Sequence, residues 1–208
     1  MVKESRALPL ISIGVFFPGG RLFEGRNNNG ITELMLRTSA KGAWKMRSAP
    51  ILSVFERNGA RIETLAEADF FGYVLTGLKV GFEKNLDALF EAIQQPQFEE
   101  PQIEKERSLL RAEASRLTDS QVLYSRQLLK QAIYGDHPYG LPPLGTAESL
   151  PRISRTELKE WHSQFVQKAI PVIVIAGDTE GSELVARLSG YVSTVGAEPI
   201  DLKMALPV

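Results

Sequence analysis

The sequence predicts an α+β fold in which helices pack on one face of a mostly antiparallel sheet. Runs rich in β-branched and aromatic residues occur near the start, in the middle and near the end of the chain, and amphipathic helical patterns separate them. Two of these runs are joined by a short link that suits an antiparallel hairpin. This arrangement is typical of an α+β domain and fits a doubly wound parallel sheet less well.

The predicted strands are apolar segments that end at turn residues. The first ends at Pro18-Gly19-Gly20, and the hairpin turns at Ala68-Asp69. We expect the first strand to be buried, and the second hairpin strand is rich in Phe, Tyr, Val and Leu. The predicted strands are 10–17, 61–67, 70–79 and 171–178.

The predicted helices follow from apolar spacing and from cap residues. The first begins at Ile31, where a stripe with i, i+3, i+4, i+7 spacing starts and the preceding Asn27-Asn28-Asn29-Gly30 segment supplies cap chemistry. Ser154 and Glu157 form a capping-box pattern at the start of a later helix. The predicted helical segments are 31–42, 50–58, 85–95, 102–117, 121–134, 154–165 and 182–188.

Length and charge set further bounds. At 208 residues we expect one main domain, residues 1–196, followed by a linker, residues 197–208, toward a further domain. The net charge of −1 offers no field that would attract nucleic acid, and no apolar run approaches the ~20 residues of a membrane span. We therefore expect a soluble chain with no nucleic-acid partner, and both periplasmic and cytoplasmic locations stay open.

Histidine and cysteine counts limit the chemistry. The chain has no cysteine, which removes disulfides, thiol nucleophiles and thiolate ligands. Its two histidines, His137 and His162, are widely separated, whereas a catalytic zinc takes about three protein ligands. We expect His137 to stabilise a Gly/Pro-rich loop and His162 to be structural. The Gly177-Asp178 pair lacks a G-x-G-x-x-G continuation, and a serine triad would have only these histidines as base.

Several segments resemble, in order, the pitrilysin/insulinase family of zinc peptidases, the inverzincins, which carry H-x-x-E-H on a helix. The resemblance extends over most of the chain, from Pro18 to Asp178. The segments are Pro18-Gly19-Gly20, Glu24, Gly30-Ile31, Lys41-Gly42-Ala43, Glu106-Arg107 with Glu113, His137-Pro138-Tyr139-Gly140, the 144–150 stretch LGTAESL, and Ala176-Gly177-Asp178.

The zinc motif itself has changed, because the positions that match H-x-x-E-H read Glu33, Leu34, Met35, Leu36 and Arg37. By the resemblance, Glu33 and Arg37 stand where family members have imidazole ligands, one helical turn apart. Leu36 stands where they have the carboxylate that activates zinc-bound water. Leucine neither binds metal nor transfers a proton, and arginine is effectively always protonated.

Glu113 matches the third zinc ligand of the family, yet one carboxylate does not hold zinc by itself. Two interpretations of Glu33 and Arg37 stay open. One is an i, i+4 ion pair on a helix surface, worth about 0.2–0.5 kcal/mol. In the other, the Arg37 guanidinium replaces the zinc charge and bridges Glu33 and Glu113. For Glu113 itself, the alternative is a solvated helix residue near Glu106 and Arg107 with no functional role. Under either interpretation of Glu33 and Arg37, we expect no catalytic residue, no bound metal and no cofactor.

The resemblance implies a non-catalytic member of the family, similar to the non-catalytic subunits of processing peptidases. Its expected partners are a zinc-bearing paralogue with intact H-x-x-E-H, with which it forms a closed chamber, and an extended peptide held there by addition to a sheet edge. Two alternatives stay open. One is an active zinc metallopeptidase that uses non-standard ligands, and the other is a structural assembly scaffold that binds no peptide.

Overall fold

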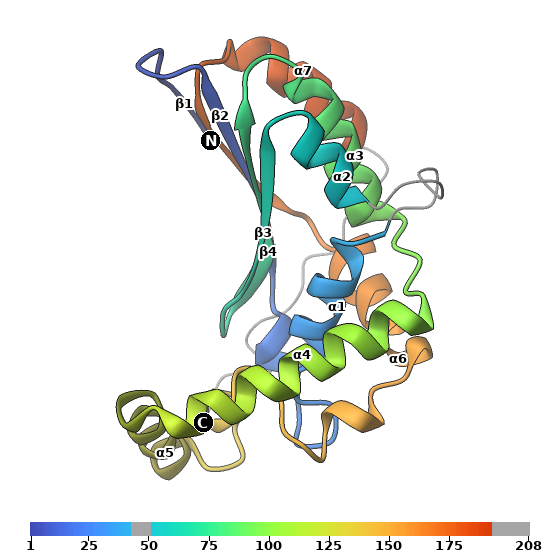
Figure 1. Ribbon diagram of the computed structural model, residues 1–208. Helices are drawn as coiled ribbons and strands as arrows, with labels where there is room; N and C mark the ends of the chain where they lie inside the picture. Colours follow the sequence, from blue (N-terminus) through green and yellow to red (C-terminus); the bar gives the residue numbers. More distant parts are fainter. Residues whose placement is uncertain (43–50, 193–208) are drawn as a thin grey trace.

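One five-stranded sheet, with the order β1-β5-β2-β4-β3, carries helices on a single face (Figure 1). The computed structural model describes residues 1–42 and 51–192. The predicted α+β class is confirmed. The strands are β1 (Val2–Glu4), β2 (Leu10–Pro18), β3 (Ala60–Ala66), β4 (Phe70–Leu78) and β5 (Val172–Gly177).

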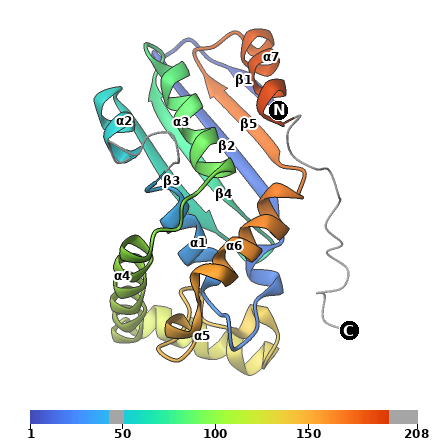
Figure 2. The same cartoon turned by 90° about the vertical axis from the view of Figure 1, so that its right-hand side faces the viewer.

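Helices fill the intervals between the strands. The α-helices are α1 (Ile31–Ser39), α2 (Ile51–Arg57), α3 (Phe82–Gln94), α4 (Glu100–Asp119), α5 (Gln121–Tyr134), α6 (Arg155–His162) and α7 (Gly181–Val192). The 3-10 turns are η1 (Gly20–Phe23), η2 (Pro138–Gly140) and η3 (Leu150–Arg152), and the π-helical turn η4 (Ser163–Gln167) continues α6. Figure 2 shows α3 and α6 lying over the covered face of the sheet.

The sheet is antiparallel except at one edge. The central strand β2 pairs antiparallel with both β4 and β5, and β3 and β4 form the predicted hairpin. The short strand β1 pairs parallel with β5 and was not predicted. Its three residues include two charged ones, so it has neither the length nor the alternation that identifies a strand.

The core lies between the sheet and the helices. Alternate residues of β2 and β4, among them Ile13, Phe17 and Tyr73, point to the helices and are at most 2% exposed. No helix from residues 1–42 and 51–192 lies over the other face, where Phe70 is 41% and Val172 61% exposed. The first predicted strand is therefore buried on one face only, because helices cover the sheet on one side.

Helix α1 is the most enclosed element near the sheet. Every residue in it except Arg37 is buried, so the expected one-sided stripe understates its burial. The reason is its position, because α1 contacts β3 and β4 on one side and α4 and α6 on others. A helix surrounded in this way needs a partner for every polar side chain it carries.

The N-cap residue of α1 is Gly30, which lies in the predicted cap segment 27–30, but no asparagine side chain caps the helix. The nearby Glu24 carboxylate bonds the free backbone N–H groups instead. The Oε2 atom of buried Glu24 accepts from the backbone N–H of Gly30 at 2.8 Å and from the side-chain amide of Asn29 at 3.0 Å, while Oε1 accepts from the N–H of Thr32 at 3.1 Å. Burial raises the pKa of Glu24, and these hydrogen bonds oppose that shift. A carboxylate at a helix N-terminus also meets the positive end of the helix dipole.

Two glycines let another loop approach this cap. Gly30 has φ of 93° and Gly145 has φ of 83°. A Cβ atom on Gly30 would lie 2.9 Å from the Gly145 Cα, and one on Gly145 would lie 2.7 Å from the Asn29 carbonyl oxygen. The Ser149 hydroxyl donates to that same carbonyl at 2.7 Å. The 144–150 loop is thus tied to the start of α1.

The remaining predictions differ from the structure mainly at element ends. The helix at 121–134 and the capping box of Ser154 and Glu157 are confirmed. Helix α3 begins at Phe82, earlier than predicted, because Gly81 supplies a left-handed N-cap. The predicted boundary between residues 196 and 197, the linker at 197–208 and the start of the second predicted helix at Pro50 lie outside the described residues.

Candidate functional site

Arg37 bridges two carboxylates from two helices. Its Nε donates to Glu33 Oε1 at 2.6 Å, one turn earlier on α1. Its two terminal nitrogens donate to the two oxygens of Glu113 on α4, each at 2.8 Å. The bridging interpretation of Arg37 is therefore the one the structure shows, and the pair with Glu33 is one half of it. The bidentate contact matches the planar fork of a guanidinium.

Burial makes this bridge stronger than a surface ion pair. The side chain of Glu33 is 11% exposed, that of Arg37 20% and that of Glu113 42%. The Arg37 hydrogen bonds lower the pKa of Glu113, and the two carboxylates raise the pKa of Arg37. Both shifts favour the charged forms of Arg37 and Glu113.

A second contact lies beside the first on the same two helices. Lys41, just after α1, forms an ion pair with Glu106 of α4, whose side chain is 1% exposed. The Gln102 amide donates to the same Glu106 oxygen at 2.9 Å. The next residue, Arg107, donates to the Ile153 carbonyl at 2.6 Å and so ties α4 to the loop before α6.

The residues at this place do not fit a zinc ion. The guanidinium of Arg37 lies between the two carboxylates, and its fixed positive charge repels a metal there. Leu36 is fully buried and has no group that accepts a proton. Across residues 1–42 and 51–192, no three His, Cys, Asp or Glu side chains gather as a metal site.

Neither histidine supplies a ligand or base to this place. His137 caps η2, where its Nδ1 accepts from the Tyr139 backbone N–H at 3.2 Å. His162 is buried on α6, with Nε2 2.6 Å from the Ile93 carbonyl oxygen, and burial lowers its pKa. Asp178, considered for a nucleotide loop, forms an ion pair with Lys79 at 2.8 Å.

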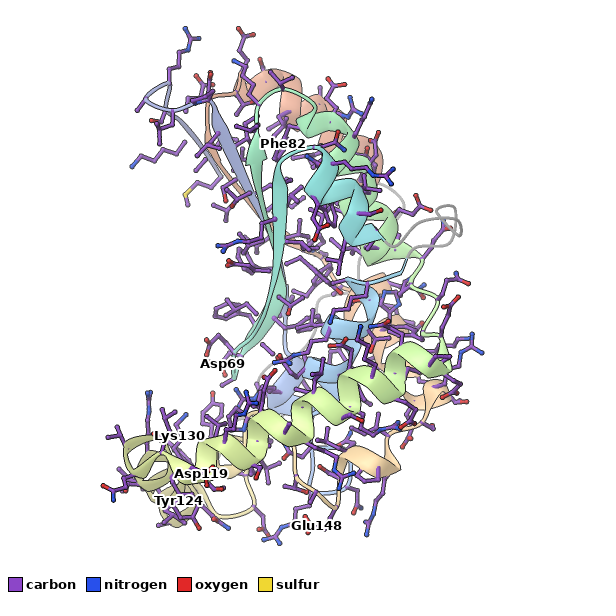
Figure 3. The ribbon with its side chains drawn as sticks, in the orientation of Figure 1. Asp69, Phe82, Asp119, Tyr124, Lys130 and Glu148 are labelled. Atoms are coloured by element: carbon purple, nitrogen blue, oxygen red, sulfur yellow. The ribbon has the colours of Figure 1, made fainter. Side chains whose placement is uncertain are left out.

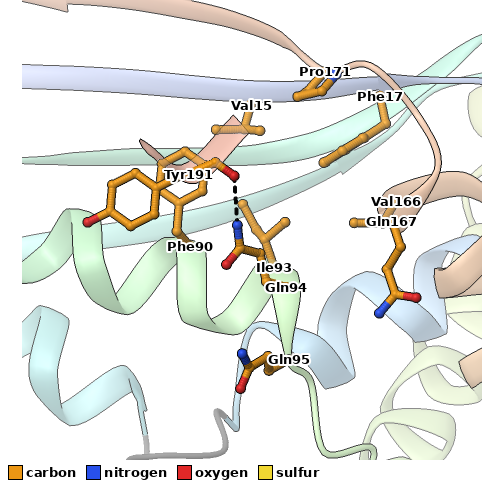
Figure 4. Close-up of a pocket in the computed structure, with 10 residues that line it drawn as sticks. All are labelled: Val15, Phe17, Phe90, Ile93, Gln94, Gln95, Val166, Gln167, Pro171 and Tyr191. Atoms are coloured by element: carbon orange, nitrogen blue, oxygen red, sulfur yellow. Dashed lines mark hydrogen bonds between the residues drawn. The ribbon is translucent and has the colours of Figure 1, made fainter. Parts of the chain in front are cut away.

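The structure also contains a cavity of about 480 Å³ between the sheet, α3, η4 and Tyr191 (Figure 4). Its polar side chains are glutamines and one tyrosine, and the Gln94 amide donates to the Tyr191 carbonyl at 2.9 Å. None of its lining residues belongs to the Arg37 bridge, and none is an acid or base suited to catalysis near neutral pH. The lining residues are Val15, Phe17, Phe90, Ile93, Gln94, Gln95, Val166, Gln167, Pro171 and Tyr191.

Comparison with known proteins identifies the family. A family model described as insulinase, peptidase family M16, matches residues 2–147. The chain belongs to the M16 family. Within this family it is a degenerate metallopeptidase-like domain, since the H-x-x-E-H positions carry other residues, and the predicted family membership is confirmed.

Its relatives carry names of different kinds. The chain is 29% identical over 177 residues to cytochrome b-c1 complex subunit 1 of Caenorhabditis elegans, covering 85% of this chain and 38% of that protein. It is 26% identical to the uncharacterized zinc protease YmxG of Bacillus subtilis, covering 88% and 44%. It is 23% identical to the non-peptidase homolog YmxG of Helicobacter pylori, covering 90% and 43%. The chain thus spans about two fifths of these M16 relatives.

Solved structures agree on the M16 fold. A crystal structure of a peptidase M16 inactive domain from Pseudomonas fluorescens has a TM-score of 0.84 at 23% identity, covering 95% of this chain and 48% of that chain. At this identity the likeness establishes the shared fold. No helix among residues 1–42 and 51–192 has the length and apolar character to cross a membrane.

The Lys41–Glu106 contact was not anticipated from the sequence, although a signal was present. Glu106 and Glu113 are seven residues apart and flank Leu110 on the buried face of α4, while Arg37 and Lys41 are four residues apart. Two acids on one helix and two bases on the other, both at helical spacing, match the two contacts. Apolar patterns alone gave no reason to pair these helices.

We predict that Arg37→Met lowers the free energy of unfolding by about 1–3 kcal/mol, because Glu33 stays nearly buried without its charged partner. Urea denaturation measures this loss. Arg61→Met is the matched control, since Arg61 pairs with Glu63 at an exposed position where the pair adds little. Equal effects of the two substitutions would contradict the bridge.

The stability loss caused by Arg37→Met is expected to depend on pH. The folded-state pKa of Glu113 lies below its ordinary value of 4.5, so its ion pair contributes fully above that pH and is lost as pH falls through the lowered pKa. The stability gap between the natural chain and Arg37→Met is expected to hold constant above about pH 5 and to shrink below about pH 4. A gap that grows on acidification would rule out this contribution of Glu113.

A further prediction tests whether α1 and α4 keep the spacing of a metal site. The double variant Glu33→His, Arg37→His places two imidazoles beside Glu113, a donor set of the kind that zinc takes. We expect one zinc ion per chain at about micromolar affinity or tighter, measured by calorimetric titration, and no peptide hydrolysis, because Leu36 cannot act as base. The single variant Glu33→His is the control. Equal zinc binding by both variants would refute this prediction.

Proposed function

We propose that the chain is a non-catalytic domain that forms one wall of a two-part M16 assembly and pairs with a zinc-bearing paralogue. The observation that carries the proposal is the Arg37 bridge. A permanent cation holds the two carboxylates at the positions that match the metal site, Glu33 and Glu113, and the neighbouring base position is the buried Leu36. Such a place stabilises the contact between α1 and α4 and has no means to activate water.

The names of the relatives support a pairing function. The Caenorhabditis elegans relative is named as a subunit of the cytochrome b-c1 complex, and the Helicobacter pylori relative as a non-peptidase homolog. Both are longer than this chain, which leads us to propose that residues 197–208 link the domain to a further one. On this proposal the partner supplies the intact H-x-x-E-H helix.

The open sheet face and its edge support peptide holding as part of this proposal. Strand β3 is outermost in the sheet and lies next to α1, so one of its edges has no strand partner in the described part of the chain. An extended peptide can add to such an edge through backbone hydrogen bonds. Near the β3–β4 turn, a hollow of about 500 Å³ between Phe16, Leu65, Phe70 and Val172 offers room for an apolar side chain.

The experiment combines the chain with an H-x-x-E-H paralogue from the same genome. We expect no chelator-sensitive peptide cleavage by the chain alone, a stable complex on gel filtration, and cleavage by the pair at least about tenfold above the paralogue alone, equal to about 1.4 kcal/mol of transition-state stabilisation. The matched control replaces the catalytic glutamate of the paralogue and should abolish all cleavage.

Each failure has its own meaning. Chelator-sensitive cleavage by the chain alone would favour a metallopeptidase with non-standard ligands. A stable complex without an effect on peptide cleavage or binding would favour an assembly scaffold. The absence of any complex would overturn the pairing itself.

A further inference from the structure

Helix α5 extends from the domain without burying any of its own residues. It follows α4 at Ser120 and lies at the lower left in Figure 1, below the sheet and away from α3 and α7. Its contacts are mainly with α4 and with the η2 turn, where the Gln127 amide donates to the Gly140 carbonyl at 2.8 Å. Tyr124 and Lys130 mark this end of the molecule in Figure 3.

The outward side of α5 is an apolar stripe. Val122, Leu129 and Ile133 are 77%, 60% and 64% exposed. Their spacing of i, i+7 and i+11 places them on one side of a helix, and Arg126 at i+4 lies between them. This set of four residues, here called the α5 stripe, has the spacing of helices that dock in apolar grooves.

Leaving an apolar helix face exposed to water costs free energy, so such a face indicates a binding surface. An isolated helix of about 12–15 residues is marginal in water, and most helices in proteins are stabilised by an apolar face packed on a core. In α5 no residue is buried, and Val122, Leu129 and Ile133 are the most exposed of its large apolar side chains. Clustered exposed apolar side chains on a folded domain mark an interaction surface.

The charge around the stripe defines the chemistry of what covers it. Residues 121–135 contain two cations, Arg126 and Lys130, and no acidic residue. The acid that follows, Asp136, already pairs with Arg26. A complementary surface therefore has an apolar groove for Val122, Leu129 and Ile133 and carboxylates at its rim.

We infer that the α5 stripe is the surface by which this domain docks on its zinc-bearing paralogue, in an apolar groove bordered by acidic residues. This inference rests on the proposed function, which supplies the partner. The recognition chemistry lies in three exposed apolar side chains at helical spacing and in two cations, Arg126 and Lys130, whose own helix contains no acidic residue.

A second copy of the chain fits the stripe less well. Two α5 helices packed together would lie about 8–10 Å apart and would bring four cations to one seam with no carboxylate between them. The hollow of a second copy, lined by Phe16, Leu65, Phe70 and Val172, is also a poor receptor for the α5 stripe. The only charged side chain in its lining is Asp69. That carboxylate already accepts a hydrogen bond from the Tyr139 hydroxyl at 2.5 Å, which raises the pKa of Tyr139 to about 12.

The test compares two double variants in binding to the H-x-x-E-H paralogue. Val122→Glu, Leu129→Glu places charges in the stripe, whereas Leu8→Glu, Val80→Glu changes equally exposed apolar residues elsewhere, which are 63% and 87% exposed. We expect the stripe variant to weaken the dissociation constant by at least about tenfold and the control by less than about twofold. Thermal unfolding of both variants verifies that they fold. We expect both to fold, because all four substituted side chains are exposed.

Hydrogen exchange on the unaltered chain gives an independent reading. The amides of α5 are expected to exchange rapidly in the free chain and to be protected in the complex, because few contacts hold the free helix. Binding that is equally strong in the stripe variant, or α5 amides that stay unprotected in the complex, would overturn the α5 stripe and leave the pairing intact. Absence of binding by the natural chain would overturn both.

Discussion

A nearly buried carboxylate beside a second, partly exposed one requires a cation, and this requirement organises the contact between α1 and α4. Glu33 on α1 and Glu113 on α4 approach the same point from two helices, and Arg37 satisfies both at 2.6–2.8 Å. Charges removed from water are tolerated when their hydrogen bonds are satisfied. The guanidinium thus supplies locally the positive charge that a bound metal supplies in other members of the family, but as a fixed part of the chain that takes no part in proton transfer.

The scaffold around this point does not depend on the metal motif. Glu24 caps α1, Gly30 and Gly145 allow the 144–150 loop to approach the cap, and Trp161 on α6 donates to the Thr32 hydroxyl at 3.2 Å. These contacts hold α1 in position and involve none of the residues at the H-x-x-E-H positions, 33–37. They explain in physical terms why the segments around the zinc helix still resemble those of zinc peptidases although the helix has lost its ligands.

The sequence predicted the elements whose patterns are local and missed those that depend on distant partners. Alternation and aromatic content identified β2, β4 and β5, and the α5 bounds were predicted correctly because polar turns flank the segment. Strand β1 has only its pairing with β5 to define it. The Lys41–Glu106 contact joins residues 65 positions apart. The Glu24 cap joins a carboxylate to backbone groups only six and eight residues later, which no side-chain pattern marks. An i, i+4 pair such as Glu33 and Arg37 looks alike in sequence whether or not a third group completes it.

The Arg37 bridge also bears on how α5 is presented. The last buried residue of α4 is Leu110, and the bond between Arg37 and Glu113 lies just beyond it. From Glu113 to the end of α4 at Asp119 the helix advances about 9 Å at 1.5 Å per residue, over a stretch that buries no side chain. The direction of that stretch is therefore set by the contacts at its inner end. A rigid bidentate ion pair there holds α4, and with it α5, at a defined angle to the sheet, so the place that matches the metal site of the family links the core to an exposed helix.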